Sequence, residues 1–186
     1  MRSPIMKREK IFQTLTNLFL IAAISMFFTS CTSPRAIRIE FDPYEVNPDG
    51  KYQVYIATED TPWKQEVVSQ LALELGSDYN LKIENLSSLN DIQTGEWDVI
   101  LVLSTFYAFG LQSDTEAFLG ELLEKDKTIL VVTSAISDLS DYGIDSITAA
   151  SVGNTKEDAK SLTPKREPSA ISDEILQLIK KKTHSF

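Results

Sequence analysis

The feature that most constrains the fold is an uninterrupted aliphatic run, Val99 to Leu103. A strand with one face in water alternates apolar and polar residues, but these five consecutive residues do not alternate. Both faces of this strand must therefore be covered. That is typical of a central strand in a parallel sheet flanked by helices, and Thr128 to Ala135 is a second segment of the same kind.

Strands and helices are predicted to alternate along the chain from residue 51 onward. The expected strands are 51–58, 81–84, 99–103, 128–135 and 145–150, with 81–84 alternating as an edge strand does. This order predicts a doubly wound, mostly parallel, five-stranded sheet of the α/β class with right-handed crossovers.

Local signals predict where the three helices begin. Thr61 or Asp60 caps a helix that opens at Pro62 and closes at Gly76. Ser113 to Glu116 has the form of a capping box, and the last helix starts at Ser169 or Ser172. The expected buried residues of the last two helices are Phe118, Leu119, Leu122, Leu123, Ile171, Ile175, Leu178 and Ile179.

The charge and the scarce Cys and His residues exclude several function classes. The net charge is -9, and removal of residues 1–30 would leave 14 basic and 26 acidic residues. Such a surface repels phosphate backbones, so no nucleic-acid partner is expected. Cys31 is the only cysteine, and His184, the only histidine, is expected in a frayed tail. Triads, Cys/His pairs and His/Cys zinc sites are therefore not expected.

The first thirty residues have the tripartite form of a bacterial secretory signal. A basic segment, starting at Met1 or at Met6, precedes the apolar run Leu18 to Phe28 and two small residues. Residues 28–31 resemble a lipobox, although Phe28 replaces the usual leucine. Cys31 is thus the predicted lipidation site, carrying fatty-acyl chains such as palmitate, on an extracytoplasmic lipoprotein of the cell envelope. The alternative is an uncleaved membrane anchor, for which the apolar run is short.

The predicted organisation has four parts. The signal peptide is 1–30, a lipid-anchored, proline-containing tether is 31–50, the folded domain is 51–182, and a flexible tail is 183–186. Ile37, Ile39 and Phe41 alternate, so part of the tether is expected to lie along the domain as an edge strand.

From Lys51 to about Lys182 the chain resembles the flavodoxin-like family, whose strand order is 2-1-3-4-5. The resemblance depends on the element order, on residues 97–107 (WDVILVLSTFY) and on residues 143–151 (GIDSITAAS). It implies an FMN site at the carboxyl edge of the sheet, with the phosphate at a helix amino terminus. The residues implied in FMN binding are Thr58, Thr61, Ser104, Thr105, Phe106, Tyr107 and Ser134.

The loop after the first strand departs from that family pattern. It reads Thr58 to Trp63 without glycine, Pro62 removes one amide donor, and Glu59 and Asp60 bring negative charge toward a phosphate. Each such carboxylate opposes phosphate binding by roughly 1 kcal/mol or more. Phe106 and Tyr107 could stack on a flavin, but we favour the alternative in which they cap the core or face a protein partner.

Acidic residues give a weaker alternative at the same edge. Glu59, Asp60, Asp138 and Asp141 could converge on Mg²⁺ or Ca²⁺, although acids commonly cap helix starts. A phosphorelay receiver is rejected because Ser104 and Ser151 stand where its aspartate and lysine would be. The lysines 180–182 are expected to complement the helix dipole.

The sequence thus predicts a lipid-anchored domain that is not an enzyme and binds an unknown protein or small molecule, with no cofactor. The alternative is an FMN-binding electron-transfer flavoprotein of the cell envelope.

Overall fold

The computed structural model describes residues 40–107, 110–133, 142–149 and 166–184. The chain divides into two units, Met1–Ile37 and Arg38–Phe186, and every described residue belongs to the second. The predicted signal peptide and Cys31 therefore lie outside the described residues. Within the described ranges, no helix is both long and apolar enough to cross a bilayer.

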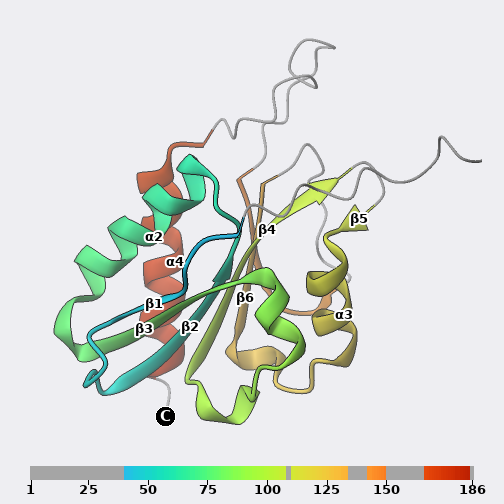
Figure 1. Cartoon of the computed structure of the whole chain (residues 1–186). Coiled ribbons are helices and arrows are strands. Elements are labelled where there is room, and N and C mark those ends of the chain that lie inside the picture. The colour runs from blue at the N-terminus through green and yellow to red at the C-terminus, as the bar shows by residue number, and fades with distance from the viewer. Residues whose placement is uncertain (1–39, 108–109, 134–141, 150–165, 185–186) are drawn as a thin grey trace, which may run out of the picture. The chain divides into compact units, whose positions relative to one another are not determined.

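One mixed sheet forms the centre of this unit (Figure 1). Five parallel strands lie in the order β3-β2-β4-β6-β7, and β1 pairs antiparallel with β3. A short strand, β5, forms a hairpin with β4. The strands are β1 Tyr44–Val46, β2 Tyr52–Thr58, β3 Tyr79–Asn85, β4 Val99–Tyr107, β5 Gly110–Leu111, β6 Thr128–Thr133 and β7 Asp145–Thr148.

The predicted count of five strands is wrong, because β1 and β5 add two, and the full order β1-β3-β2-β4-β6-β7 differs from the predicted one for this reason. The segment 81–84 is not an edge strand either, since β1 pairs with it in register Tyr44 to Ile83. Part of the predicted tether does form an edge strand, as expected, but that strand is 44–46. Of the residues expected in it, Ile37 and Ile39 lie outside the described residues, and Phe41 is not in a strand.

Helices cover both faces of the sheet, as the non-alternating run in β4 requires (Figure 1). Val99, Leu101 and Leu103 face α2 Pro62–Leu75 and α4 Pro168–Thr183. Ile100 and Val102 face α3 Ser113–Glu121 and the 3₁₀ turn η2 Leu86–Asn90. All five β4 residues are fully buried, and burial of each such side chain contributes about 1.5–3 kcal/mol. The remaining turns are η1 Gly76–Asp78, η3 Thr94–Glu96 and η4 Lys125–Lys127.

Helix α2 begins and ends where the sequence predicts. The Thr61 side chain accepts a hydrogen bond from the Lys64 amide, Pro62 occupies the first turn, and Gly76 closes the helix with φ of 66°. Only glycine adopts that backbone conformation without strain.

The other two helices start differently from the predictions. Gln112, not Ser113, precedes α3, no side chain caps it, and the expected capping box is absent. Leu123, expected in the core, lies beyond the end of α3 and is 95% exposed. Helix α4 begins at Pro168 after Glu167, before either predicted serine, because proline fits the first helical position.

Strand β1 and the chain before it are held by asparagine side chains. Asn85 accepts a hydrogen bond from the Phe41 amide at 3.0 Å and donates one to the Phe41 carbonyl at 2.9 Å. Asn80 donates to Glu45 Oε1 at 2.7 Å and to Gln53 Oε1 at 2.8 Å. These bonds fix the residues around Phe41 at the carboxyl end of β3, which is where the site lies.

The end of α4 packs against the opposite, amino-terminal end of the sheet. The Thr183 hydroxyl is buried and lies 3.1 Å from the Tyr79 hydroxyl, and the His184 ring lies 5.7 Å from that of Tyr52. The expected frayed position of His184 is therefore wrong. Lys182 also does more than complement the helix dipole, because it is 9% exposed and lies 2.6 Å from Asp145 Oδ2.

Candidate functional site

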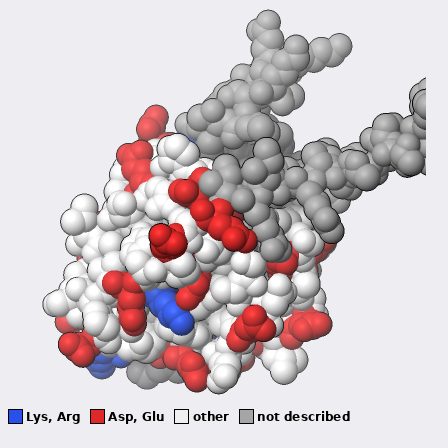
Figure 2. Space-filling model, viewed as in Figure 1, with Lys and Arg blue, Asp and Glu red and all other residues white. Residues whose placement is uncertain are grey.

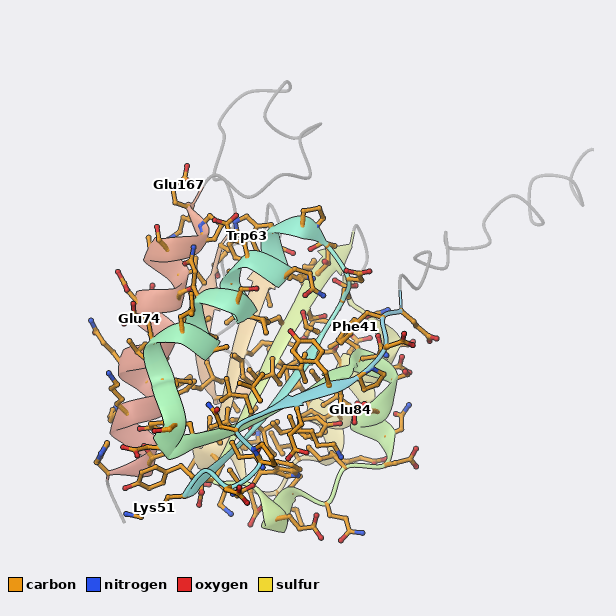
Figure 3. All side chains as sticks on the ribbon, turned by 60° about the vertical axis from the view of Figure 1, so that its left-hand side comes forward. Phe41, Lys51, Trp63, Glu74, Glu84 and Glu167 are labelled. Atoms are coloured by element: carbon orange, nitrogen blue, oxygen red, sulfur yellow. The ribbon has the colours of Figure 1, made fainter. Side chains whose placement is uncertain are left out.

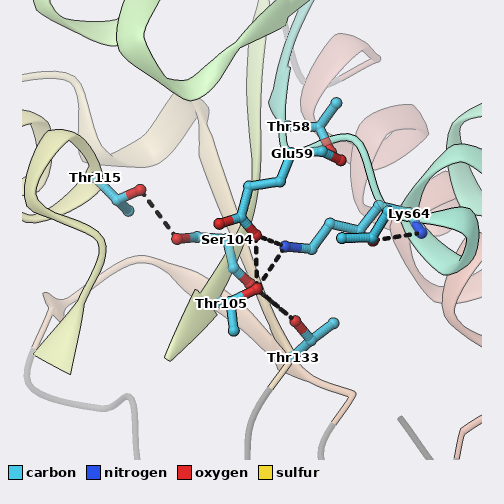
Figure 4. A network of polar contacts seen from close by, with 8 residues as sticks. Thr58, Glu59, Lys64, Ser104, Thr105, Thr115 and Thr133 are labelled. Carbon is cyan, nitrogen blue, oxygen red and sulfur yellow. Dashed lines mark hydrogen bonds and ion pairs between the residues drawn. The ribbon is translucent and has the colours of Figure 1, made fainter. Parts of the chain in front are cut away.

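The carboxyl ends of β2, β4 and β6 bring hydroxyl side chains together at one edge of the sheet (Figure 4). Strand register pairs Thr105 with Thr133, and the loop from β2 to α2 passes over both. Parallel strands place their carboxyl ends at a common edge, which is where open α/β folds bind ligands.

A lysine–glutamate pair occupies this edge. Lys64, in the first turn of α2, is 1% exposed, and its Nζ donates to Glu59 Oε2 in the preceding loop. The Glu59 side chain is 12% exposed. Burial lowers the pKa of Lys64 and is the largest influence, while the charge of Glu59 opposes it. The pair thus neutralises a cation that would be very unfavourable alone in this position.

Hydroxyl groups complete the hydrogen bonding of this pair. The Thr105 hydroxyl donates to Glu59 Oε2 at 2.6 Å and accepts from Lys64 Nζ at 2.8 Å. The single hydroxyl proton of Thr105 is used in the hydrogen bond to Glu59, so Thr105 can only accept in its 3.1 Å contact with the Thr133 hydroxyl. The Thr133 hydroxyl also lies 3.4 Å from the Ser104 carbonyl, which is a second acceptor for its proton. The Thr105 hydroxyl thus donates to Glu59 and accepts from Lys64, and the four residues form one polar cluster at this edge.

The residues that the family resemblance implies in FMN binding are mostly buried or hydrogen-bonded within the protein. Thr58 and Ser104 are 1% and 0% exposed, and Ser104 Oγ accepts from Thr115 Oγ1 of α3 at 3.0 Å. Thr61 caps α2, and Phe106 packs partly buried against the core on the α3 face. Tyr107 ends β4, its side chain lies outside the described part, and Ser134 lies outside the described residues.

The predicted acidic residues are only partly described. Glu59 binds Lys64, and Asp60 accepts from Gln65 Nε2 at 3.2 Å. Asp138 and Asp141 lie outside the described residues. Among the residues that are described, no group of three or more His, Cys, Asp or Glu could hold a metal ion.

A cleft lies beside this polar cluster, at the carboxyl ends of β2 and β3 and the start of α3. It has about 20 Å³ of water-accessible space and is lined by Glu40, Thr58, Glu59, Asn85, Leu86, Ser87 and Gln112. That space is enough for roughly one water molecule. The cleft is therefore far smaller than the sites of roughly 300–1,000 Å³ that hold drug-sized ligands.

Comparisons with known proteins found two solved structures with low similarity to the chain. The chain is 13% identical to oxidised flavodoxin 2 from Bacillus cereus, with a TM-score of 0.44 over 70% of this chain and 99% of that one. It is 12% identical to an oxidoreductase from Corynebacterium diphtheriae, with a TM-score of 0.40 over 72% of this chain and 96% of that one. No family model and no curated protein matches the chain. The flavodoxin-like arrangement itself depends on the strand order and the two helical layers described above.

The most important residue that sequence reasoning missed is Lys64. The buried positions of α2 are 64, 67, 68, 71 and 75, so Lys64 lies on the apolar stripe of the helix. A lysine in that position, with a glutamate five residues before it, was the available signal. The cleft residues carry no comparable signal, because they come from three segments that are distant in sequence: Glu40, residues 85–87 and Gln112.

Proposed function

We propose that this chain is a lipid-anchored, extracytoplasmic, flavodoxin-like protein that acts as a binding module and not as a flavoprotein. The supporting observation is the Lys64–Glu59 pair at the start of α2. Lys64 is a buried cation at this helix start, where a flavin phosphate would be expected, and it already has an internal carboxylate as its partner. A phosphate would have to displace that carboxylate or lie beside its negative charge.

The backbone at the same helix start supports the proposal. Anion sites at helix amino termini use free amide groups. Here the Thr61 amide donates to the Glu59 carbonyl at 2.9 Å, Pro62 has no amide hydrogen, and the Lys64 amide donates to Thr61 Oγ1. The residues present therefore do not fit a flavin phosphate.

Flavin titration tests the first part of the proposal. The full chain, purified in a non-ionic detergent, is titrated with FMN and with riboflavin while visible absorption and flavin fluorescence are recorded. We expect no stoichiometric uptake of either flavin at about 0.1 mM, a limit that corresponds to binding weaker than about 5.5 kcal/mol. A yellow one-to-one complex with FMN would overturn the proposal and favour the electron-transfer alternative.

Riboflavin separates the phosphate argument from the rest. It has the same ring system without the phosphate group. One-to-one binding of riboflavin but not of FMN would confirm that Glu59 opposes the phosphate, yet would show that the edge still binds a flavin ring.

The anchoring part of the proposal rests on the lipobox-like sequence that ends at Cys31. A Cys31→Ala variant should remain uncleaved and take up no labelled palmitate, whereas the neighbouring Ser33→Ala variant should be processed normally. Gel mobility and palmitate labelling of the membrane fraction measure both. Unchanged processing and labelling of Cys31→Ala would contradict the lipid anchor.

A further inference from the structure

The carboxylate of Glu59 is the outer member of the buried ion pair. Lys64 is 1% exposed and Glu59 is 12% exposed, so the carboxylate is the part of the pair that reaches the surface. Figure 4 shows the Glu59 side chain entering the polar cluster from the loop before α2 and the Lys64 side chain entering it from α2 itself. The amine of Lys64 is therefore covered by a carboxylate that belongs to the same chain.

Two donors from different elements converge on one oxygen of that carboxylate. Glu59 Oε2 accepts a hydrogen bond from Lys64 Nζ of α2 and, at 2.6 Å, from the Thr105 hydroxyl of β4. Hydrogen bonds with an ionised donor or acceptor are short and strong, and an ammonium group and a hydroxyl together match a carboxylate oxygen. The two donors thus form a position that fits a carboxylate group, whichever molecule supplies it.

The backbone of the loop holds Glu59 at this position. The Glu59 carbonyl accepts from the Thr61 amide at 2.9 Å and from the Thr58 hydroxyl at 3.3 Å. A carboxylate on a loop that is fixed in this way has an effective concentration at Lys64 far above that of a free carboxylate in solution. An external carboxylate therefore competes poorly with Glu59 in the native chain.

The charge of the surrounding surface also disfavours free anions. Acidic side chains are spread widely over the face shown in Figure 2, whereas basic ones cover a small area. Glu40, which lines the small cleft next to Glu59, is exposed and adds a further negative charge at this edge. The potential outside the ion pair is therefore negative, which lowers the concentration of anions near it.

We infer that the carboxyl edge of the sheet carries a carboxylate-binding site that the chain fills with its own Glu59 side chain. This autoinhibitory contact closes the site, and a carboxylate from outside binds only in place of Glu59. The inference rests on the proposed function and deepens it, because it names the group that the buried cation accepts and the residue that keeps other anions out. Phosphate fits less well, since the Thr61 and Lys64 amides are already used and Pro62 has none.

Chemical rescue of a truncated variant tests the inference. Glu59→Ala removes the carboxylate and the carbon next to it, which together have the size and charge of acetate, and leaves Lys64 without that partner. The full chain is purified in non-ionic detergent, and urea unfolding is followed by circular dichroism in sodium acetate or in NaCl of equal ionic strength. If acetate binds with a dissociation constant of roughly 10 mM, about 0.2 M acetate should lower the unfolding constant of Glu59→Ala about 20-fold.

Matched variants separate this effect from a general effect of acetate on stability. Glu59→Gln keeps the side-chain volume without the charge, so acetate has no room beside Lys64 and should stabilise no more than NaCl does. Glu59→Ala/Lys64→Met has the space without the cation, and Glu74→Ala lacks an exposed carboxylate in the last turn of α2, so neither should respond specifically to acetate. Line broadening of ¹³C-labelled acetate in NMR should show saturable binding to Glu59→Ala alone.

The possible results separate this inference from the proposed function. The inference is overturned if acetate acts on Glu59→Ala no more than NaCl does, no more than on the double variant or the native chain, or less than inorganic phosphate. If Glu59→Ala folds only in acetate, the inference is supported, and if it folds in neither salt, the inference is overturned. Absence of rescue leaves the proposed function standing. One-to-one FMN binding by the native chain overturns the proposed function, whatever the result with acetate.

Discussion

At the scale of single residues, Lys64 and Glu59 should depend strongly on each other. Removal of one partner from a buried ion pair costs about 3–5 kcal/mol, because the other charge is left buried and unpaired. Lys64 is the more deeply buried partner. We therefore expect Glu59→Gln to lower the free energy of unfolding by more than Lys64→Met does, with urea unfolding as the measurement.

The double variant Glu59→Gln/Lys64→Met is the control for that prediction. It leaves no charge at the site, so it should be more stable than Glu59→Gln alone by about 2 kcal/mol or more. Additive losses in the double variant would show that the two side chains do not act as a pair.

The free energy of unfolding that the same pair contributes should change with pH in a defined direction. Burial holds the pKa of Lys64 below its usual value of 10.5, so between those two values the unfolded chain binds more protons than the native chain. Stability contributed by this site should then rise with pH. The native chain should therefore gain stability relative to the double variant as the pH is raised toward 10.5. Burial raises the pKa of Tyr55 above 10.0, so the titration of Tyr55 lowers stability as the pH rises. Tyr55 is present in both proteins, so its effect cancels when their stabilities are subtracted.

Sequence reasoning at this scale found hydroxyls and acids but misjudged their use. Thr58, Ser104 and Thr105 were predicted from strand ends and do lie at the sheet edge. Their partners depend on contacts such as Lys64 to Thr105, which are 41 residues apart. No local pattern encodes such a contact, although the place of Lys64 on the buried stripe of α2 indicates that it needs a partner.

At the scale of elements, the contribution of the Thr61 cap to the stability of α2 can be tested directly. The Thr61 side chain caps the helix, and Thr61→Ala should lower the free energy of unfolding by about 1 kcal/mol. Ser69→Ala is the matched control, since Ser69 is exposed in the helix interior and alanine favours the helix there. Equal losses in the two variants, measured by urea unfolding, would contradict a specific capping role for Thr61.

The elements that were predicted correctly have strong local causes, and those that were missed do not. Aliphatic runs specify β4 and β6, and the Thr61–Pro62 start specifies α2. The edge strand of the tether was expected at residues 37–41, but β1 lies at 44–46, because it is short and depends on Asn80 and Asn85, which are distant in sequence. The capping box expected at Ser113 does not form, because α3 begins at Ser113 itself, one residue earlier than predicted. At this point the chain leaves the hairpin β4–β5.

At the scale of the whole molecule, the layers hold together around contacts between distant segments. Ser172 of α4 donates to the Val67 carbonyl of α2 at 3.4 Å, and Trp63 Nε1 donates to the Arg166 carbonyl at 3.1 Å. Figure 3 shows Trp63 at the same end of the molecule as Glu167, where α4 begins. The two helices thus support each other along one face of the sheet.

The net charge of -9 should make stability depend on salt. Like charges destabilise a compact state, and salt screens exposed charges while leaving buried pairs such as Lys64–Glu59 nearly unaffected. We expect the Tm to rise by about 2–4 °C between low salt and about 0.5 M NaCl, equivalent to roughly 1 kcal/mol. Sulfate salts are avoided because they strengthen apolar burial independently of charge.

Two exposed glutamates test whether self-repulsion causes that rise. Glu74 lies in the last turn of α2 and Glu121 ends α3, and neither helix has a basic residue in its last turn. Both carboxylates therefore oppose the negative end of a helix dipole. Glu74→Gln/Glu121→Gln should raise the Tm at low salt and reduce its further rise with NaCl. A Tm that falls as NaCl is added would mean that surface ion pairs outweigh repulsion, and the explanation by net charge would be wrong.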